Sequence, residues 1–597
     1  MKRRAVGLSF ALAAILFIIG DAQATSWYVD NAVASSGNGQ SWATAYKNFS
    51  NIGWANVHAG DFVYISGGPS GGTKIYTESW SIVSISGAVA NPITISVDAA
   101  NTSHNGTVVF DYNAKGDTAT VDGIFFANNS YITLTGNVNG QNHIAFKNLR
   151  NIIDRWVSHC ITGYNNTGII FDHLDMTNCN NGISVSFTGT GNEIRYSNFT
   201  QIRGDAAMSV AAEGTAWDEI LIHDNTVETL VNNTPPPGQS SYGGPDGIQC
   251  SGGMSAYRNN FRVSNTTVYT SSQHPDMFQL QGNFLKIYDN EFTNVGDSHI
   301  DYDCYNNSTP HDVRIYNNLF RVVQVIDPYP EYFRLYISNS KALTSINNFK
   351  LLNNTFIDNT GFDNGQNVGF VTVRFNGFQA NNPTGSGNEI KNNIFYNCGN
   401  GSQYQNVYIA ASTGFTNASF SFDNNVYYNS AKPPHIYYNG ADYTAASWIA
   451  AREPHGKTNA PAFVSYSPNN ANNNLHLAST DTVAKDAGVS LSGYFTDDKD
   501  GVVRPQGPAW DIGAFEYMPT NVRIPMTGNR KNDQELTIFH LNPIKTTIFK
   551  QYLQVNKNLE VYNVLGRPVK KELLENEGIY LVKEKNTMVK QRVVVIK

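Results

Sequence analysis

Hydrophobic and polar positions in the middle of the chain repeat with a long period. Seven segments share one pattern, in which an Asn is followed two residues later by a hydrophobic residue. They are Asn225-Thr-Val227, Asn259-Asn-Phe261, Asn290-Glu-Phe292, Asn318-Leu-Phe320, Asn354-Thr-Phe356, Asn393-Ile-Phe395 and Asn425-Val-Tyr427. The segments are spaced 34, 31, 28, 36, 39 and 32 residues apart. Such a period, carried by β-branched and aromatic residues without helical periodicity, is typical of a solenoid in which each repeat forms one turn.

Each predicted turn is one coil of a parallel β-helix, in which Phe and Val stack inside. The Asn residues would lie at bends, where left-handed backbone angles and side-chain-to-backbone hydrogen bonds are useful. No strong amphipathic helix pattern occurs after the first thirty residues, so we expect an all-β protein. A β-helix presents a long, rigid and open face, for which polymers are the natural ligands.

Composition narrows the class of protein. Charged residues make up 15% of the chain and aromatic residues 12%, and Gly occurs 50 times, which suits an extracellular β-rich protein with many turns. The net charge of -7 argues against nucleic acid as a partner. The five cysteines are odd in number and widely spaced, so they do not form a fully paired disulfide framework. We expect most of them to be small buried residues, at Cys160, Cys179, Cys250, Cys304 and Cys398.

The first 24 residues have the three parts of a secretory signal peptide. Lys2-Arg3-Arg4 precedes an apolar run from Ala5 to Ile19, and Ala22-Gln-Ala24 forms a small-residue cleavage site. The apolar run is short for a bilayer-spanning helix, although an uncleaved anchor is the alternative. We therefore expect a mature protein that is secreted or displayed on a bacterial cell surface, with no transmembrane segment after cleavage.

Strands alternate with Gly-rich turns from Trp27 to Gly68, in Trp27-Tyr-Val-Asp30, Gly39-Gln-Ser-Trp42 and Gly60-Asp61-Phe-Val-Tyr64. This start resembles the N-terminal cap and first coil of secreted right-handed parallel β-helix proteins. That group includes pectate lyases, alginate and chondroitin lyases and polygalacturonases. The resemblance implies one right-handed β-helix domain over residues 25–518. Residues 475–517 resemble the terminal segment of such proteins, which would cover the open core of the last coil. Asp497 to Asp500 would alternatively hold calcium.

Composition changes after Pro519, because 13 of the 41 basic residues fall between Asn529 and Lys597. Short strands are predicted at Leu559 to Gly566, Gly578 to Val582 and Val593 to Lys597. With Asn542-Pro543, they resemble the C-terminal sorting domain of the type IX secretion system, a small β-sandwich. The resemblance implies that residues 519–597 are a linker and an address read by bacterial secretion machinery. A carbohydrate-binding β-sandwich is the competing interpretation.

Two near-duplicate pentapeptides carry the candidate chemistry. Pro245-Asp246-Gly-Ile-Gln249 and Pro275-Asp276-Met-Phe-Gln279 precede the Asn of their coils by similar distances. Their Asp side chains should therefore stack about one coil spacing, roughly 4.8 Å, apart and point the same way as the Gln side chains. Stacked carboxylates raise one pKa or require a cation, and both outcomes are typical of functional sites. The alternative is that these Asp residues cap turns.

Asp276 and Gly296-Asp297 lie 21 residues apart, which resembles the spacing of catalytic Asp residues in polygalacturonases. Ser298 stands where that family has a second consecutive Asp. Hydrolysis needs one protonated carboxyl group and one carboxylate that activates water. The residues predicted to be catalytic are Asp246, Asp276, Asp297, His299 and Asp301.

A lyase needs a cation or Arg that neutralises a uronate, and a base such as Lys, Arg, His or Tyr. Calcium suits a ladder of carboxylates, and Asp246, Asp276 and Asp303 are its predicted ligands. Lys286 is among the basic candidates near the ladder. The residues predicted to bind substrate are Gln249, His274, Gln279, Tyr305 and Arg334.

The sequence therefore indicates a secreted polysaccharide-degrading enzyme. Carboxylates outnumber convincing bases in the predicted ladder, which favours a glycoside hydrolase acting through adjacent coils. A calcium-dependent lyase of uronate-containing glycans is the first alternative. A non-catalytic surface adhesin or glycan-binding protein is the second, since fold alone does not establish activity.

Overall fold

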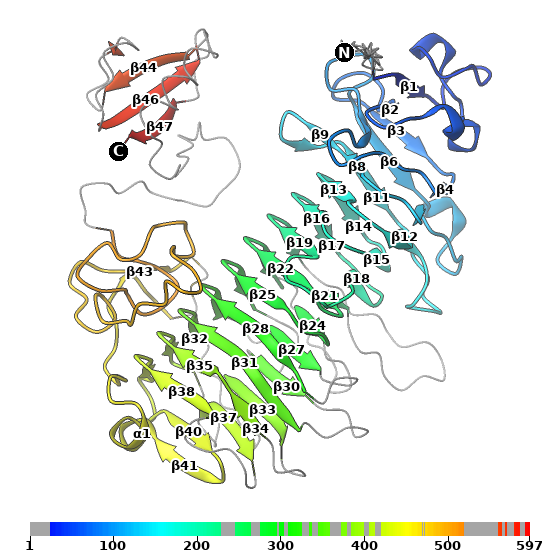
Figure 1. The fold of residues 1–597 in the computed structure, drawn as a ribbon. Helices are drawn as coiled ribbons and strands as arrows, with labels where there is room; N and C mark the ends of the chain where they lie inside the picture. Colours follow the sequence, from blue (N-terminus) through cyan, green and yellow to red (C-terminus); the bar gives the residue numbers. More distant parts are fainter. Residues whose placement is uncertain are drawn as a thin grey trace, which may run out of the picture. The chain divides into compact units, whose positions relative to one another are not determined.

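A computed structural model gives the fold (Figure 1). It describes residues 24–228, 245–263, 275–294, 298–303, 309–324, 333–336, 344–358, 372–378, 384–398, 405–411, 419–468, 470 and 472–518, and four strands between 559 and 596. The chain divides into two units. Unit 1 comprises residues up to Ala212 with Glu219–Leu221, and unit 2 comprises Glu213–Asp218 and the residues from Ile222 onward.

Unit 1 consists of coils that each contribute one strand to three parallel sheets, here A, B and C. Sheet A has β1 (Ser26–Val29), β2 (Phe62–Ile65), β5 (Ile93–Val97), β8 (Ile132–Thr135), β13 (Ile170–Asp172) and β16 (Asn192–Arg195) in this order, followed by β19 (Ile220–His223). Sheet B has β3 (Thr73–Tyr76), β6 (Thr107–Asp111), β11 (Ile144–Lys147), β14 (Leu174–Thr177) and β17 (Asn198–Thr200). Sheet C has β4 (Trp80–Val83), β7 (Ile124–Ala127), β12 (His159–Asn166), β15 (Asn181–Phe187) and β18 (Ala206–Ala211).

Unit 2 has the same three-sheet plan. Sheet A has β22 (Met254–Tyr257), β25 (Leu285–Tyr288), β28 (His311–Tyr316), β31 (Ser345–Leu352), β35 (Asn388–Lys391) and β38 (Phe420–Asp423), with β34 (Thr384–Ser386) beside β31. Sheet B has β20 (Thr226–Glu228), β23 (Asn260–Arg262), β26 (Glu291–Thr293), β29 (Leu319–Val322), β32 (Thr355–Asp358), β36 (Ile394–Tyr396) and β39 (Val426–Tyr428). Sheet C has β21 (Asp246–Cys250), β24 (Phe278–Leu280), β27 (Ile300–Asp303), β30 (Phe333–Tyr336), β33 (Val373–Phe378), β37 (Gln405–Ala411), β40 (His435–Tyr438) and β41 (Ala441–Thr444).

The smaller elements lie between or after these coils. They are the hairpins β9 (Asn137–Val138) with β10 (Gln141–Asn142) and β42 (Phe463–Ser465) with β43 (Asn474–Leu477), four 3-10 turns at Trp42–Thr44, Phe49–Asn51, Trp54–Asn56 and Asn113–Lys115, and helix α1 (Ala445–Arg452). The sequence pattern did not reveal α1. The parallel sheets confirm the predicted right-handed parallel β-helix, and strands dominate the described residues.

The Asn of the seven-fold repeat forms a continuous ladder in unit 2. Each backbone N–H and each side-chain Nδ2 donates to the Oδ1 of the Asn one coil further on, at 2.9–3.1 Å. The predicted left-handed angles fall one residue earlier, at Asp224, Arg258, Asp289, Asn317, Asn353, Asn392 and Asn424. The ladder hydrogen bonds and the left-handed angle fall on different residues because a ladder Asn needs its backbone N–H aligned with the next coil.

The aromatic residues of the same repeat stack inside unit 2, as predicted. Phe261, Phe292, Phe320, Phe356, Phe395 and Tyr427 form one column with ring centroids 5.1, 4.7, 4.6, 5.1 and 5.3 Å apart. All six side chains are buried. Burying one such ring stabilises the fold by about 1.5–3 kcal/mol, and the stacking adds to this. Four predicted core cysteines are also buried, and Cys304 lies outside the described residues.

Residues 475–517 lie along the outside of sheet B rather than over the last coil, which corrects the expectation for this segment. Leu475, Leu477 and Phe515 pack against the outward-facing Ile357 and Ile394. The bend asparagines hold the segment, for example through Asn353 Nδ2, which donates to the carbonyls of residues 511 and 513 at 2.9 and 3.0 Å. At the end of the solenoid, α1 packs on β40 and β41 instead.

The described part of residues 519–597 forms one antiparallel sheet. Its order is β45 (Pro568–Val569), β44 (Leu559–Asn563), β46 (Gly578–Glu584) and β47 (Gln591–Ile596). The three strands predicted there are confirmed, while the sorting role stays a prediction. The predicted signal peptide lies outside the described residues except for Ala24. Across the described residues, no helix has the length and apolar character needed to cross a membrane.

Candidate functional site

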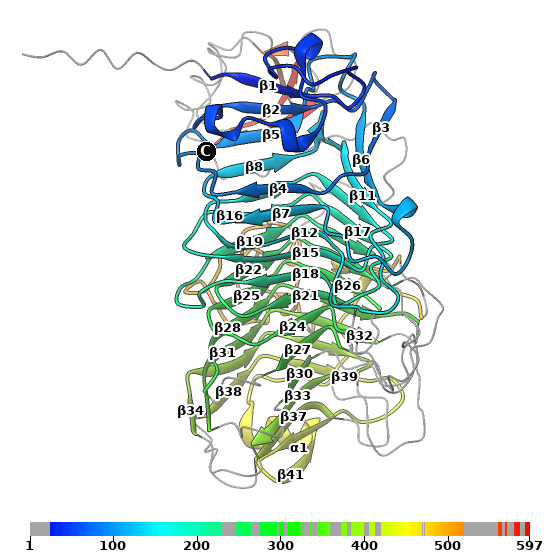
Figure 2. The same ribbon diagram turned by 90° about the vertical axis from the view of Figure 1, so that its right-hand side faces the viewer.

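Alternation along sheet C of unit 2 separates core positions from outward positions. Ile248, Phe278 and Ile300 pair with one another and are fully buried in the core. The following residue of each strand therefore faces outward. The positions in register with these residues form one row, here called the sheet C row, made of Gln249, Gln279, Asp301, Arg334, Arg374, Tyr408 and Tyr437, of which Arg334 and Tyr408 are placed by backbone register alone. Figure 2 shows the strands β21, β24, β27, β30, β33 and β37 that carry it, stacked in this order.

The row brings together four residues that the sequence predicted for the site, namely Gln249, Gln279, Asp301 and Arg334. Neighbouring positions are one coil apart, roughly 4.8 Å. Gln249 and Gln279 are partly exposed, whereas Asp301 is buried. Arg334 is placed by its backbone, and its side chain lies outside the described part of the structure.

Sequence reasoning missed Arg374 and the two Tyr positions of the row. The signal was the alternation in Val373-Arg374-Phe375, where both hydrophobic residues are fully buried. It escaped notice because no Asn-x-Phe marker lies at a fixed distance from it. Arg374 therefore joins the candidate site from the structure alone.

Asp246 and Asp276 occupy equivalent places on adjacent coils, as predicted, but their carboxylates are buried. Asp246 Oδ1 accepts the Asp276 N–H at 2.9 Å, and Asp276 Oδ1 accepts the Ser298 N–H at 3.1 Å. The exposed fraction is 1% for Asp246 and 0% for Asp276. Through these hydrogen bonds the two Asp side chains join one coil to the next. In addition, Gln249 Nε2 donates to Asp246 Oδ2 at 2.9 Å. Their catalytic roles stay predictions.

His299 lies in the core rather than on the predicted ligand face. Its ring centroid is 5.5 Å from those of Phe292 and Phe320, and the side chain is fully buried. Burial lowers the pKa of His299 to about 3, so the ring is neutral near pH 7. His299 differs from the prediction because it precedes Ile300, at the corner where the chain enters strand β27.

Three further predicted residues, His274, Asp297 and Tyr305, lie outside the described residues. Asp303 belongs to β27, two positions after Asp301, and pairs with Tyr336. Its backbone therefore places it on the same face of the sheet as Asp301, while its side chain is not described.

The predicted calcium site is only partly covered by the described residues, because the side chain of Asp303, one of its three predicted ligands, lies outside them. Calcium takes six to eight oxygen ligands. Among the side chains that the structure describes, no group of three or more His, Cys, Asp or Glu residues is placed to hold a metal ion. Asp246 and Asp276 each use one oxygen to accept a backbone N–H. Asp498 likewise accepts three backbone N–H groups, from residues 500, 502 and 516.

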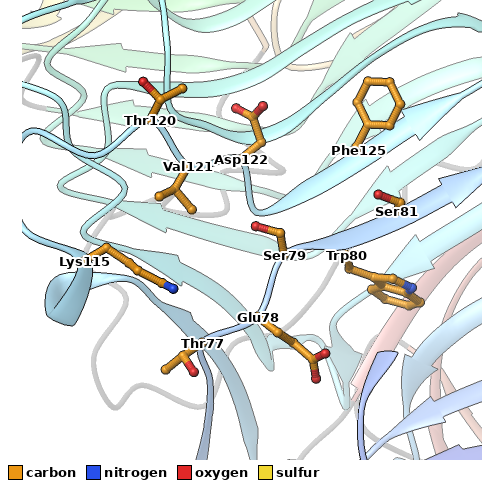
Figure 3. A pocket seen from close by; sticks show the side chains of 10 residues that line it. All are labelled: Thr77, Glu78, Ser79, Trp80, Ser81, Lys115, Thr120, Val121, Asp122 and Phe125. Atoms are coloured by element: carbon orange, nitrogen blue, oxygen red, sulfur yellow. The ribbon is translucent and has the colours of Figure 1, made fainter. Parts of the chain in front are cut away.

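Unit 1 holds a cavity of about 470 Å³ that sequence reasoning did not identify (Figure 3). It is lined by Thr77, Glu78, Ser79, Trp80, Ser81, Lys115, Thr120, Val121, Asp122 and Phe125. Burial raises the pKa of Glu78. Burial works to raise the pKa of Asp122 as well, but hydrogen bonds from the side chain and backbone of His159 lower it overall. Opposite shifts of two carboxyl groups are a known arrangement for acid and base roles.

Both carboxyl groups of this cavity also have structural tasks. Glu78 Oε1 accepts the Phe49 N–H at 3.2 Å, and Asp122 Oδ1 accepts the His159 N–H at 3.0 Å. Figure 3 shows Ser79 lying between the two side chains. Because it also contains carboxyl groups, the unit 1 cavity is the comparison site when the sheet C row is tested by mutation.

The solved structures to which this chain is similar have TM-scores below 0.5. A complex of XylC with xylose has a TM-score of 0.41 and 10% identity, over 83% of this chain and 98% of that chain. A PL6 family polysaccharide lyase from Pseudopedobacter saltans has a TM-score of 0.36 and 14% identity, over 66% and 92%. Pectate lyase Pel9A has a TM-score of 0.32 and 15% identity, over 82% and 96%. No family model and no curated protein matches the chain.

Proposed function

We propose that the protein is a secreted enzyme that degrades an acidic polysaccharide bound along the sheet C row. One observation carries the proposal, which is that strand register puts Asp301 directly beside Arg334, and Arg334 beside Arg374. A carboxylate with two cationic positions on successive coils suits a polymer whose sugars carry carboxylates. The Gln side chains on the preceding coils add hydrogen-bonding groups for sugar hydroxyls.

Hydrolysis is the proposed reaction, with Asp301 and Asp303 as its two carboxyl groups. The two residues are two positions apart on the same strand, β27. Carboxyl pairs in inverting glycosidases lie about 6.5–9.5 Å apart, which leaves room for a water molecule. One carboxyl group would protonate the leaving oxygen, while the other would take a proton from the attacking water.

The arginine positions define the substrate class. A guanidinium binds a carboxylate through two parallel N–H donors, so Arg334 and Arg374 would hold uronate groups on successive sugars. The same pair favours β-elimination as a second candidate, because a lyase must neutralise the uronate carboxylate before removing the α proton. In that case the arginines supply the positive charge that calcium would otherwise bring.

The test compares D301N with E78Q on a panel of plant and algal polysaccharides. New reducing ends report hydrolysis, and absorbance of unsaturated uronates reports elimination. We expect D301N to lose on the order of 10²-fold or more in turnover at unchanged melting temperature, and E78Q to keep wild-type turnover. Loss of activity in E78Q alone would move the site to the unit 1 cavity. Binding without any product would instead indicate a glycan-binding protein.

The substrate class is tested with R374Q. This variant should raise KM for a uronate polymer while leaving KM for a neutral polymer unchanged, because it removes one carboxylate contact. The matched control is R258Q, since Arg258 lies outside the row and pairs with Asp224 at 2.6 Å. Equal effects of both variants would contradict the proposed role of Arg374.

A further inference from the structure

A second row of functional groups lies on the outward face of sheet A in unit 2. Lys286, Arg314 and Lys350 are in register on the consecutive strands β25, β28 and β31. Their neighbours along each strand, such as Val313 and Ile315, are buried in the core. Three cations therefore follow one another at one coil spacing, roughly 4.8 Å. We call this set the sheet A row.

The two outer cations are paired, whereas the central cation is not. Lys286 Nζ contacts both oxygens of Asp218, at 2.9 and 2.8 Å. Lys350 Nζ lies 2.9 Å from Glu389 Oε2. Within the part of unit 2 that the structure describes, Arg314 forms no ion pair with a carboxylate. Among the described residues, the sheet A row therefore carries three cations and two paired carboxylates, and Arg314 is the cation left for an anionic ligand.

Two aromatic rings hold the Arg314 guanidinium in place. Its Cζ lies 4.5 Å from the ring centre of Trp217 and 5.5 Å from that of Tyr494. Its Nε is buried and has no hydrogen-bond partner among the described residues. Trp217 also lies 5.2 Å from Lys286 Nζ, and Tyr494 lies 5.0 Å from Lys350 Nζ. Cation–π contacts hold the guanidinium without using its N–H donors.

Trp217 and Tyr494 come from two segments that are far apart in the sequence. Trp217 belongs to the short segment Glu213–Asp218, and Tyr494 belongs to the lateral segment 475–517. The Tyr494 hydroxyl donates to Glu389 Oε2 at 2.8 Å, which ties that segment to the same row. The position of Arg314 is therefore organised before any ligand arrives, which reduces the entropy cost of binding.

We propose that the sheet A row is a second glycan-binding site that takes an anionic polysaccharide through carboxylate or sulfate groups. A fixed guanidinium with N–H donors to spare binds such oxyanions in a bidentate manner. Trp and Tyr also combine an apolar body with a polar tip, which suits a sugar ring and its hydroxyl groups. The net charge of the chain is -7, so binding of an anionic polymer there would depend on the local cations of the row.

This inference is independent of the proposed catalytic function. The sheet A row lies on different strands from the sheet C row, and it holds a polymer rather than cleaving it. A site of this kind would raise the local concentration of a long substrate without changing the chemistry on a short one. A negative result for the sheet A row would therefore leave the proposal for the sheet C row intact, and the reverse also holds.

The test measures binding of the full chain to polygalacturonate, to chondroitin sulfate and to neutral dextran by affinity electrophoresis and calorimetry. All variants are made in the R374Q background, which weakens the sheet C row. We expect R314Q to bind both anionic polymers about tenfold or more weakly, the effect of losing a charge-assisted hydrogen bond. W217A should weaken binding in the same direction. R314K should lie between, because it keeps the charge and loses the planar donors.

R258Q is the matched control, since Arg258 also lies over a Tyr ring, at 4.7 Å from Tyr257, but pairs with Asp224. It should leave the Kd unchanged. Melting temperatures confirm that each variant is folded, and W217A covers the case in which R314Q is unstable. Wild-type affinity in folded R314Q or W217A would overturn the proposal, as would an equal loss in R258Q. Turnover of short oligosaccharides should be unchanged in R314Q made in the otherwise native chain.

Discussion

Asn425 ends the asparagine ladder on the carboxylate of Glu453. Its backbone N–H and its Nδ2 donate to Glu453 Oε1 at 2.8 and 2.9 Å. The other oxygen, Oε2, accepts from the Tyr427 hydroxyl at 2.9 Å and from Trp448 Nε1 at 2.8 Å. Where the solenoid has no further coil, a residue that only accepts hydrogen bonds takes the place of the next Asn.

Replacing Glu453 with Ala should destabilise the protein by roughly 2–5 kcal/mol, because buried donors lose their acceptor. Glu453→Gln should cost less, since its carboxamide oxygen still accepts from Asn425. Denaturant titration measures both changes. Glu213→Ala is the control, because Glu213 is exposed and should change the free energy of unfolding by less than about 0.5 kcal/mol. A loss below about 1 kcal/mol in the Ala variant would contradict the capping role.

The pH dependence of stability should carry a signature of Glu453. Burial raises the pKa of Glu453 to about 7, from 4.5 in the unfolded chain. Between these values the folded state binds the proton more tightly than the unfolded state. The free energy of unfolding contributed by this group is therefore greatest below about pH 4.5 and falls as pH rises through about 7.

The measurement is the stability difference between wild type and Glu453→Gln across this pH range. Gln does not titrate, so the difference isolates the Glu453 contribution from that of other groups. It should move against the wild type by up to about 3 kcal/mol on going from low to high pH. A difference that is constant with pH, or that moves in the wild type's favour, would contradict the raised pKa.

Truncating one ring of the aromatic column should lower the free energy of unfolding as much as truncating any buried core residue. Phe292→Ala should cost about 3–5 kcal/mol in the free energy of unfolding, because it leaves a cavity between two stacked rings. Phe125→Ala is the matched control, since Phe125 is partly exposed on the outside of unit 1 and should cost much less. Equal losses in the two variants, measured in denaturant, would be evidence against the register of the column.

Two substitutions of Asp276 distinguish a structural role of this residue from a catalytic one. Asp276→Ala should cost about 1–3 kcal/mol, since the buried Ser298 N–H loses its acceptor. Asp276→Asn keeps an acceptor and should stay close to wild type in melting temperature. If Asp276 only joins coils, Asp276→Asn should also keep wild-type turnover per folded molecule. A loss on the order of 10²-fold in a folded Asn variant would restore Asp276 to the catalytic site.

The periodicity of the chain was enough to predict the coils, because every turn of a solenoid must present similar residues to a shared interior. The Phe column and the adjacency of Asp246 and Asp276 followed from it. So did the adjacency of Gln249 and Gln279, since the two pentapeptides lie at similar distances from the Asn of their coils, whereas the register of Asp301 beside Gln279 came from the structure. The direction of each side chain did not follow, because the corner that precedes each strand varies and shifts a residue such as His299 from the surface to the core.

What only the tertiary structure decided is the set of contacts between segments far apart in the chain. Trp217 and Tyr494 both contact Arg314 because the lateral segment runs along the outside of sheet B and reaches sheet A. Glu453 meets Asn425 because α1 turns the chain onto the end of the ladder. Neither contact has a periodic signature. Each arises because exposed backbone groups and outward apolar residues must find partners, and the choice of partner depends on shape in three dimensions.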